Sequence, residues 1–100
     1  MKIITLCGST KFKKEFELVN RDLTLQGNII LSVGVFEHAD IEPITPDQKL
    51  KLDELHKRKI DLSDEVFVIN VGSYIGESTA SEIEYAKKKN KSIHYLENVK

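Results

Sequence analysis

Cysteine is scarce in this sequence, since Cys7 is the one cysteine among 100 residues. A single cysteine excludes an internal disulfide and any multi-cysteine metal site. No group of metal ligands stands at a recognisable sequence spacing either, so we expect neither a metal nor a cofactor.

An excess of positive charge is also missing. Lysine and arginine total 15 and aspartate and glutamate total 16, which gives a net charge of −1. Proteins that hold polymeric nucleic acid or an anionic membrane surface through charge need a basic excess. We therefore expect neither partner.

Long apolar runs are absent, and none approaches the ~20 residues of a membrane span. Met1 and Lys2 lead directly into a strand-like run rather than a signal peptide, so we expect a cytoplasmic protein. The length predicts a single domain over residues 1–100 with a modest core. A deep enclosed site would need help from a second subunit, so we expect a homo-oligomer, a dimer or higher.

The pattern of the first third of the chain predicts a strand, a helix and a second strand. Residues 2–7 form an apolar run of strand length, and residues 29–33 form a second one. Between them Phe12, Phe16 and Val19 recur at helical spacing. A unit of this length is typical of a right-handed crossover between parallel strands.

The rest of the chain repeats this alternation. The predicted elements are a helix over 46–62, a strand over 66–71, a helix over about 79–89 and a strand over 92–96. Leu52, Leu55 and Leu62 mark the expected apolar stripe of the helix at 46–62. Together the patterns predict a three-layer, flavodoxin-like (Rossmann-like) α/β fold with a parallel sheet of about four strands in the order 2-1-3-4.

This topology predicts where a ligand binds. In open α/β sheets the site lies beyond the carboxyl ends of the strands, between the first and third strands. Gly8-Ser9-Thr10 follows the first strand, and the loop with Glu37 and His38 follows the second. The segment 72–86 contains a turn and a helix start, whose free backbone N–H groups attract a phosphate or carboxylate near residues 76–82. Glu82 is its main candidate for chemistry.

Each candidate also has a structural interpretation. Thr79 to Glu82 fits a capping box, in which the glutamate only returns a hydrogen bond to the backbone. Ser9 or Thr10 fits an N-cap. Glu37 and His38 fit a solvated pair of side chains in a loop. His56, surrounded by lysines, is expected at the surface, and Cys7 is expected as a small core residue.

Three motifs together resemble the nucleoside 2-deoxyribosyltransferase superfamily, and most closely its 2'-deoxynucleoside 5'-phosphate N-hydrolase branch. They are Leu6-Cys7-Gly8-Ser9, Phe36-Glu37-His38, and the glycine turn followed by Glu82-x-Glu84-Tyr85-Ala86. The resemblance implies hydrolysis or transfer of the N-glycosidic bond of a (deoxy)nucleoside or its 5'-monophosphate. The glutamate at position 82 would be the nucleophile that attacks the anomeric carbon.

The resemblance also implies the other site residues, with Asp64 as an assisting carboxylate. The chain departs from the family where Glu84 replaces a small residue and Gly76 replaces an aspartate, and lysines 11 and 13 stand in a segment that is glycine-rich and contains arginine in the hydrolases. The expected substrate-binding residues are Gly8, Ser9, Thr10, Lys11, Glu37, His38, Gly76, Ser78 and Ser81.

Two other functions stay open at this point. One is a non-catalytic nucleotide-binding module, in which Glu82 only caps a helix. The other is a hydrolase or sensor of an NAD-like or cyclic nucleotide signal. The identity of the base, the kind of sugar, the need for a 5'-phosphate and the acceptor of the sugar are open as well.

Overall fold

The computed structural model describes residues 1–36 and 43–98 and contains one parallel sheet. Its strands are β1 (Ile3–Gly8), β2 (Ile29–Leu31), β3 (Glu65–Ile69) and β4 (Ser92–Tyr95). They lie in the order β2-β1-β3-β4, and every neighbouring pair is parallel. The predicted strand order is thus confirmed, with β1 and β3 at the centre of the sheet.

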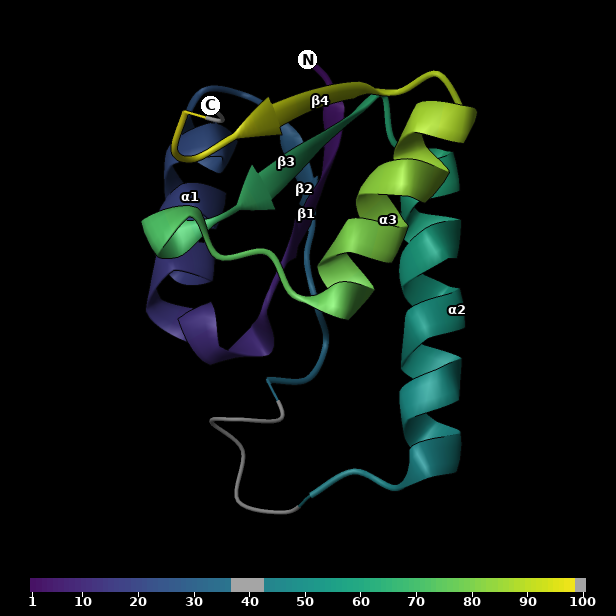
Figure 1. Ribbon diagram of the computed structural model, residues 1–100. Helices are drawn as coiled ribbons and strands as arrows, with labels where there is room; N and C mark the ends of the chain where they lie inside the picture. Colours follow the sequence, from purple (N-terminus) through teal and green to yellow (C-terminus); the bar gives the residue numbers. More distant parts are fainter. Residues whose placement is uncertain (37–42, 99–100) are drawn as a thin grey trace.

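Helices cover both faces of this sheet. They are α1 (Lys13–Leu25), α2 (Pro46–Leu62) and α3 (Glu77–Lys88), with short 3-10 turns at Thr10–Phe12 and Val71–Ser73. Figure 1 shows α1 on one face and α2 and α3 side by side on the other. The predicted three-layer α/β fold is therefore confirmed. None of the helices among the described residues is long and apolar enough to cross a membrane.

The side chains of β1 point alternately to the two faces of the sheet, so the apolar core consists of two clusters. Ile4 and Leu6 point toward α1 and pack in one apolar cluster with Phe16. Cys7 points the opposite way, into the cluster beneath α2 and α3 that contains Ile60 and other apolar side chains. Because successive strand residues face opposite sides, Cys7 is directed toward the helices that also carry Glu82.

Three of the helix termini have well-defined caps. Thr45 and Gln48 form a reciprocal capping box at the start of α2, next to Pro46 in the first turn. At the end of α1, Gly27 has φ +96° and lies in a Schellman motif, with Gly27 N–H bonded to Thr24 and Asn28 N–H bonded to Leu23. Asn90, with φ +58°, ends α3 in the same way.

Two structural expectations prove wrong. The capping box at Thr79 is absent, because α3 already begins at Glu77 after Gly76, and Glu82 lies in the second turn of the helix. The leucine stripe of α2 does not face the core, since Leu55 is 55% exposed and Leu62 is 69% exposed.

The face of α2 that turns inward carries Lys49, Asp53, His56 and Ile60, which are spaced three or four residues apart. Ile60 packs in the core under β1 and β3, whereas Lys49, Asp53 and His56 line an open cavity. The inner face of α2 is thus apolar near its end and polar near its start, and Leu52 and Leu55 border the cavity instead of packing in the core.

Candidate active site

A cavity of about 430 Å³ opens at the carboxyl ends of the central strands. Its walls come from the turn after β1, the loop segment 33–35 after β2, the inner face of α2, and the segment around 76–79 that starts α3. The cavity therefore lies at the predicted edge of the sheet, where the chain crosses from one face to the other between β1 and β3.

Glu82 reaches this cavity from α3, and only 13% of its side chain is exposed. Burial is the main reason why the pKa of its carboxyl is raised to about 7. A hydrogen bond with the Cys7 thiol lowers the pKa, and the nearby charge of Asp53 raises it further. The carboxyl of Glu82 is thus buried and faces a cavity, and it does not act as a helix cap.

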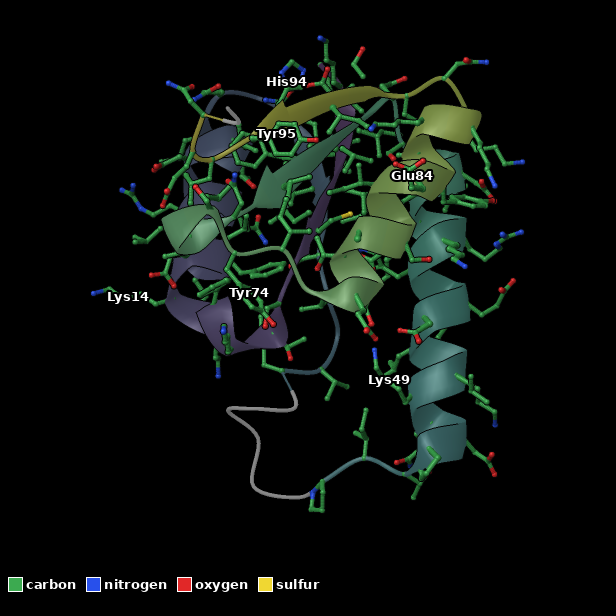
Figure 2. All side chains as sticks on the ribbon, viewed as in Figure 1. Lys14, Lys49, Tyr74, Glu84, His94 and Tyr95 are labelled. Carbon is green, nitrogen blue, oxygen red and sulfur yellow. The ribbon has the colours of Figure 1, made fainter. Side chains whose placement is uncertain are left out.

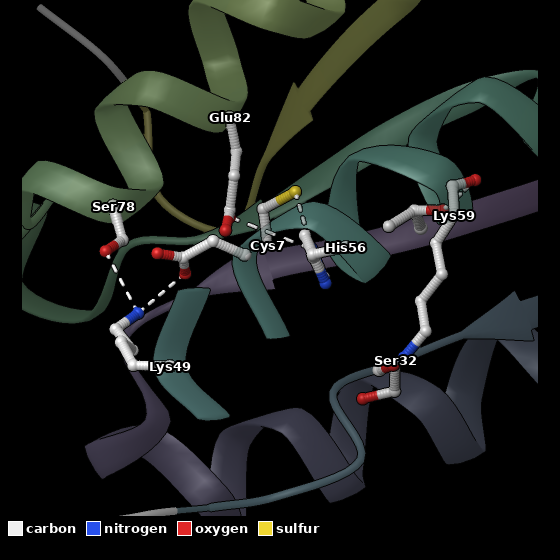
Figure 3. A network of polar contacts seen from close by, with 9 residues as sticks. Cys7, Ser32, Lys49, His56, Lys59, Ser78 and Glu82 are labelled. Carbon is white, nitrogen blue, oxygen red and sulfur yellow. Dashed lines mark hydrogen bonds and ion pairs between the residues drawn. The ribbon is translucent and has the colours of Figure 1, made fainter. Parts of the chain in front are cut away.

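Two buried side chains contact Glu82 at the base of the cavity. His56 Nε2 lies 3.7 Å from Glu82 Oε1 and 3.4 Å from Cys7 Sγ (Figure 3). Burial lowers the pKa of His56 to about 4, so the ring is neutral at pH 7 and its approach to Glu82 is not an ion pair. Burial also raises the pKa of Cys7 well above its ordinary value, so the thiol is protonated beside His56 and Glu82.

Lys49 supplies a positive charge at the mouth of the cavity. Its Nζ lies 2.7 Å from Asp53 Oδ1 and 3.3 Å from the Ser78 hydroxyl, and it reaches from α2 toward the first turn of α3 (Figures 2 and 3). The first backbone N–H groups of α3 follow Gly76, where no side chain caps the helix. An ammonium group beside free N–H groups is a suitable arrangement for an anion.

Most of the residues expected from the sequence meet at this cavity. Those that line it are Gly8, Ser9, Thr10, Gly76, Ser78 and Glu82. Ser81 lines a smaller adjoining hollow of about 230 Å³, which it shares with Ser78 and Glu82. Ser9 also accepts a hydrogen bond from Lys11 N–H at 3.4 Å, so its expected capping role and its place in the cavity coexist.

Gly8 allows the close approach of β1 and β3 where the cavity begins. A Cβ at this position would lie 2.9 Å from the carbonyl oxygen of Ile69 and 3.2 Å from Phe16. A larger residue would push the two strand ends apart, so the shape of the cavity depends on this glycine.

Other expected residues lie elsewhere. Asp64 precedes β3, and its carboxylate accepts a hydrogen bond from Ile3 N–H at 2.8 Å. That bond is at the amino ends of β1 and β3, at the opposite edge of the sheet from the cavity, so the structure gives Asp64 a strand-pairing role there. Lys11 lies over the ring of Tyr74, 3.6 Å from its centroid, and does not line the cavity itself. Glu37 and His38 lie outside the described residues.

The sequence analysis missed the contribution of α2. His56 was expected at the surface but is only 6% exposed, and Lys49 and Asp53 were not singled out. Lys59, one turn of α2 after His56, donates a hydrogen bond to the backbone carbonyl of Ser32 at 2.6 Å. This bond holds the chain where it leaves β2. The spacing of 49, 53 and 56 along one helical face is the signal that could have identified them.

Cys7, His56 and Glu82 form a group of possible metal ligands that no sequence spacing indicated. Their ligand atoms all lie within 4.8 Å of one another, which makes a possible metal site among the described residues. The three residues come from β1, α2 and α3, far apart in the sequence, so no spacing rule could reveal them.

Comparisons with known proteins support the fold. No family model matches the chain, and no curated protein matches it. Among solved structures, the CMP N-glycosidase BcmB of Clostridium botulinum is similar, with a TM-score of 0.65 and 23% sequence identity. The match covers 94% of this chain and 70% of the other. The feature that the two chains share is the fold.

Proposed function

We propose that this chain cleaves the N-glycosidic bond of a (deoxy)nucleoside or its 5'-monophosphate, with Glu82 as the nucleophile. The observation that carries the proposal is the placement of Glu82: it is largely buried yet faces a cavity of about 430 Å³ between the ends of β1 and β3. The likeness in fold to a CMP N-glycosidase favours this chemistry over others that the same fold hosts.

Cleavage of this bond requires little more than a well-placed carboxylate. Cleavage of an N-glycosidic bond passes through an oxocarbenium-like state, which a carboxylate beneath the sugar stabilises or captures. In the proposed reaction Glu82 bonds to the anomeric carbon as the bond to the base nitrogen breaks, and the base leaves with that electron pair and takes up a proton. Water then hydrolyses the glycosyl ester and regenerates Glu82.

A 5'-phosphate would bind at the start of α3, one helical turn from Glu82. Lys49 Nζ, the Ser78 hydroxyl and the N–H groups after Gly76 lie together there. The turn at Ser9 and Thr10 lines the same cavity and offers further hydroxyl groups for the sugar or phosphate. We assign these residues to substrate binding in the proposed reaction.

The proton for the leaving base needs a donor that lines the cavity. Asp53 borders both hollows beside Glu82 and is paired with Lys49 at 2.7 Å, so it would pass on a proton from water rather than supply its own. Asp64 does not line the cavity, since it is bonded to Ile3 at the other edge of the sheet. Glu84 pairs with Lys87 at 3.4 Å on the exposed side of α3. We therefore propose Asp53 in place of Asp64 as the assisting carboxylate.

The test is base release from a panel of nucleosides, deoxynucleosides and their 5'-monophosphates, followed by chromatography with and without a second free base as acceptor. We expect the wild type to release base and Glu82→Gln to lose at least ~100-fold in rate, because glutamine keeps the shape but cannot act as nucleophile. Glu84→Gln, two residues along the same helix and exposed, is the matched control and should keep full activity.

The panel separates the competing functions. Equal base release by wild type and Glu82→Gln would overturn the assignment of Glu82. No release by any variant, together with thermal stabilisation of all of them by a nucleotide, would instead support a binding module. Exchange of bases with the added acceptor would identify transfer rather than hydrolysis.

A further inference from the structure

The cluster of Cys7, His56 and Glu82 has a geometry that the proposed hydrolysis does not require. Sγ of Cys7 and Nε2 of His56 are 3.4 Å apart, Nε2 is 3.7 Å from Oε1 of Glu82, and all three atoms lie within 4.8 Å of one another. Ligands about 2.0–2.3 Å from a tetrahedral zinc ion are separated by similar distances. A zinc ion could thus be held with only small movements of the three side chains.

The chemical types of these groups favour zinc over other ions. A thiolate, an imidazole and a carboxylate are the three side-chain ligands that Zn²⁺ takes in proteins, whereas Mg²⁺ and Ca²⁺ prefer oxygen alone. One thiolate and one carboxylate balance the two positive charges of the ion, and the neutral imidazole adds none. The resulting complex is electrically neutral, which suits a buried position.

His56 is already held in a suitable position. It is 6% exposed on the inner face of α2. Its Nε2 faces Cys7 and Glu82. A histidine that binds zinc through one nitrogen commonly donates its other N–H to a backbone carbonyl or a carboxylate, which fixes the ring. The backbone of Leu6 lies beside the ring and could take this role.

The fourth position around the ion would face the cavity. Glu82 and His56 both line the cavity of about 430 Å³, while Cys7 lies behind them at 0% exposure. Three protein ligands and one open position, filled by water, characterise accessible zinc sites rather than closed structural ones. Zn²⁺ could also enter from the cavity without unfolding of the chain.

We propose that Cys7, His56 and Glu82 form a Zn²⁺ site, and that the bound ion blocks the proposed glycosidic cleavage by occupying the nucleophile. Binding replaces the thiol proton of Cys7 with the metal and releases that proton to solvent. The binding part of the proposal stands on the cluster alone, and the inhibition rests on the function proposed above.

The binding test uses Co²⁺ as a spectroscopic substitute for zinc on the untagged wild-type protein. Cobalt bound to a thiolate shows a charge-transfer absorption band, and Cys7 is the one cysteine of the chain, so such a band identifies the site without any variant. We expect the band to appear at one equivalent of Co²⁺ and to disappear when Zn²⁺ is added. Co²⁺ spectra without a thiolate band would overturn the site.

Calorimetric titration with Zn²⁺ then assigns the other ligands. Cys7→Ser and His56→Gln should each bind Zn²⁺ more than ~100-fold more weakly than the wild type, while His94→Gln, which changes an exposed histidine on β4, should bind as the wild type does. Titrations in two buffers of different ionisation enthalpy should show release of protons. Unchanged affinity in both cluster variants would contradict the proposal.

Inhibition is measured separately. If the wild type releases base, Zn²⁺ should abolish the release at one equivalent and a chelator should restore it. Undiminished release by the zinc-loaded protein would overturn the inhibitory role while leaving the binding result intact. A wild type that binds zinc but releases no base after a chelator has removed all metal would refute the proposed function and not the site.

Discussion

Glu82 and Glu84 lie two residues apart on α3 but in opposite surroundings. The side chain of Glu84 is 66% exposed and pairs with Lys87, whereas that of Glu82 is 13% exposed and meets Cys7 and His56. Because neighbouring positions on a helix face different directions, one glutamate contacts solvent and the other contacts the cavity. The resemblance in sequence selects Glu82, and the structure explains why Glu84 adds no charge to the same site.

Lys49 allows a test at the scale of one residue. Lys49→Ala removes the ammonium group beside Ser78 and the start of α3. If this group binds the 5'-phosphate, KM for nucleoside 5'-monophosphates should rise about 10–100-fold, because a hydrogen bond to a charged group contributes about 1.5–3 kcal/mol. KM for unphosphorylated nucleosides should stay within about twofold.

The control for this substitution is Lys51→Ala, which removes an exposed lysine from the same turn of α2. It should leave both KM values unchanged. Equal increases in KM for phosphorylated and unphosphorylated substrates in Lys49→Ala would refute a phosphate-binding role.

At the scale of secondary-structure elements, α2 and α3 are joined by a polar cluster near their far ends. Tyr85 on α3 donates to Asp61 on α2 at 2.6 Å and accepts from Arg58 at 2.9 Å. The Tyr85 hydrogen bond lowers the pKa of Asp61, with further lowering by the charge of Arg58. This contact holds the two helices together about one turn beyond His56 and Glu82.

Tyr85→Phe should weaken this connection in a pH-dependent way. A carboxylate with a lowered folded-state pKa stabilises the fold above its unfolded pKa of about 3.9, and this contribution is lost as the pH falls through the folded value. The destabilisation caused by Tyr85→Phe should therefore be largest near neutral pH and shrink below about pH 4.

Urea unfolding from about pH 7 down to about pH 3 measures this difference. Tyr95→Phe is the control, because the structure shows no carboxylate bonded to Tyr95 within the described residues and its loss should not vary with pH. A Tyr85→Phe difference that is constant over the whole range would contradict the proposed bond to ionised Asp61.

At the scale of the whole molecule, ligand binding should stabilise the fold, because the cavity joins segments from β1, α2 and the start of α3. A ligand that binds only the folded state at about 100 times its Kd adds about 2.7 kcal/mol to the free energy of unfolding. For a chain of this size that corresponds to a rise in Tm of roughly 10–20 °C.

The measurement is thermal unfolding of Glu82→Gln, which should bind substrate without consuming it, over a series of nucleotide concentrations. Tm should rise steadily with the logarithm of concentration for a nucleoside 5'-monophosphate and less for inorganic phosphate alone. No shift with any nucleotide or nucleoside would argue against this cavity as their binding site.

The sequence by itself determined the architecture of this protein. Strand-like runs at 2–7, 29–33, 66–71 and 92–96, separated by helical patterns, were enough to predict a parallel sheet in the order 2-1-3-4. These signals are local, because strand and helix periodicity is written in neighbouring residues. For the same reason, three features could be placed at the edge of the sheet where the strands end: the turn at Gly8, the glycine-containing turn at 72–76, and Glu82.

Only the tertiary structure decided what surrounds Glu82. His56 looked like a surface residue because its sequence neighbours are charged, and the orientation of α2 on the sheet turns it inward, where it is 6% exposed. Cys7 and Glu82 lie on different elements, so their contact with His56 exists only after packing. Conversely Asp64, suggested by resemblance, bonds to Ile3 instead. Contacts between distant segments depend on how the elements pack, and local sequence patterns do not encode that.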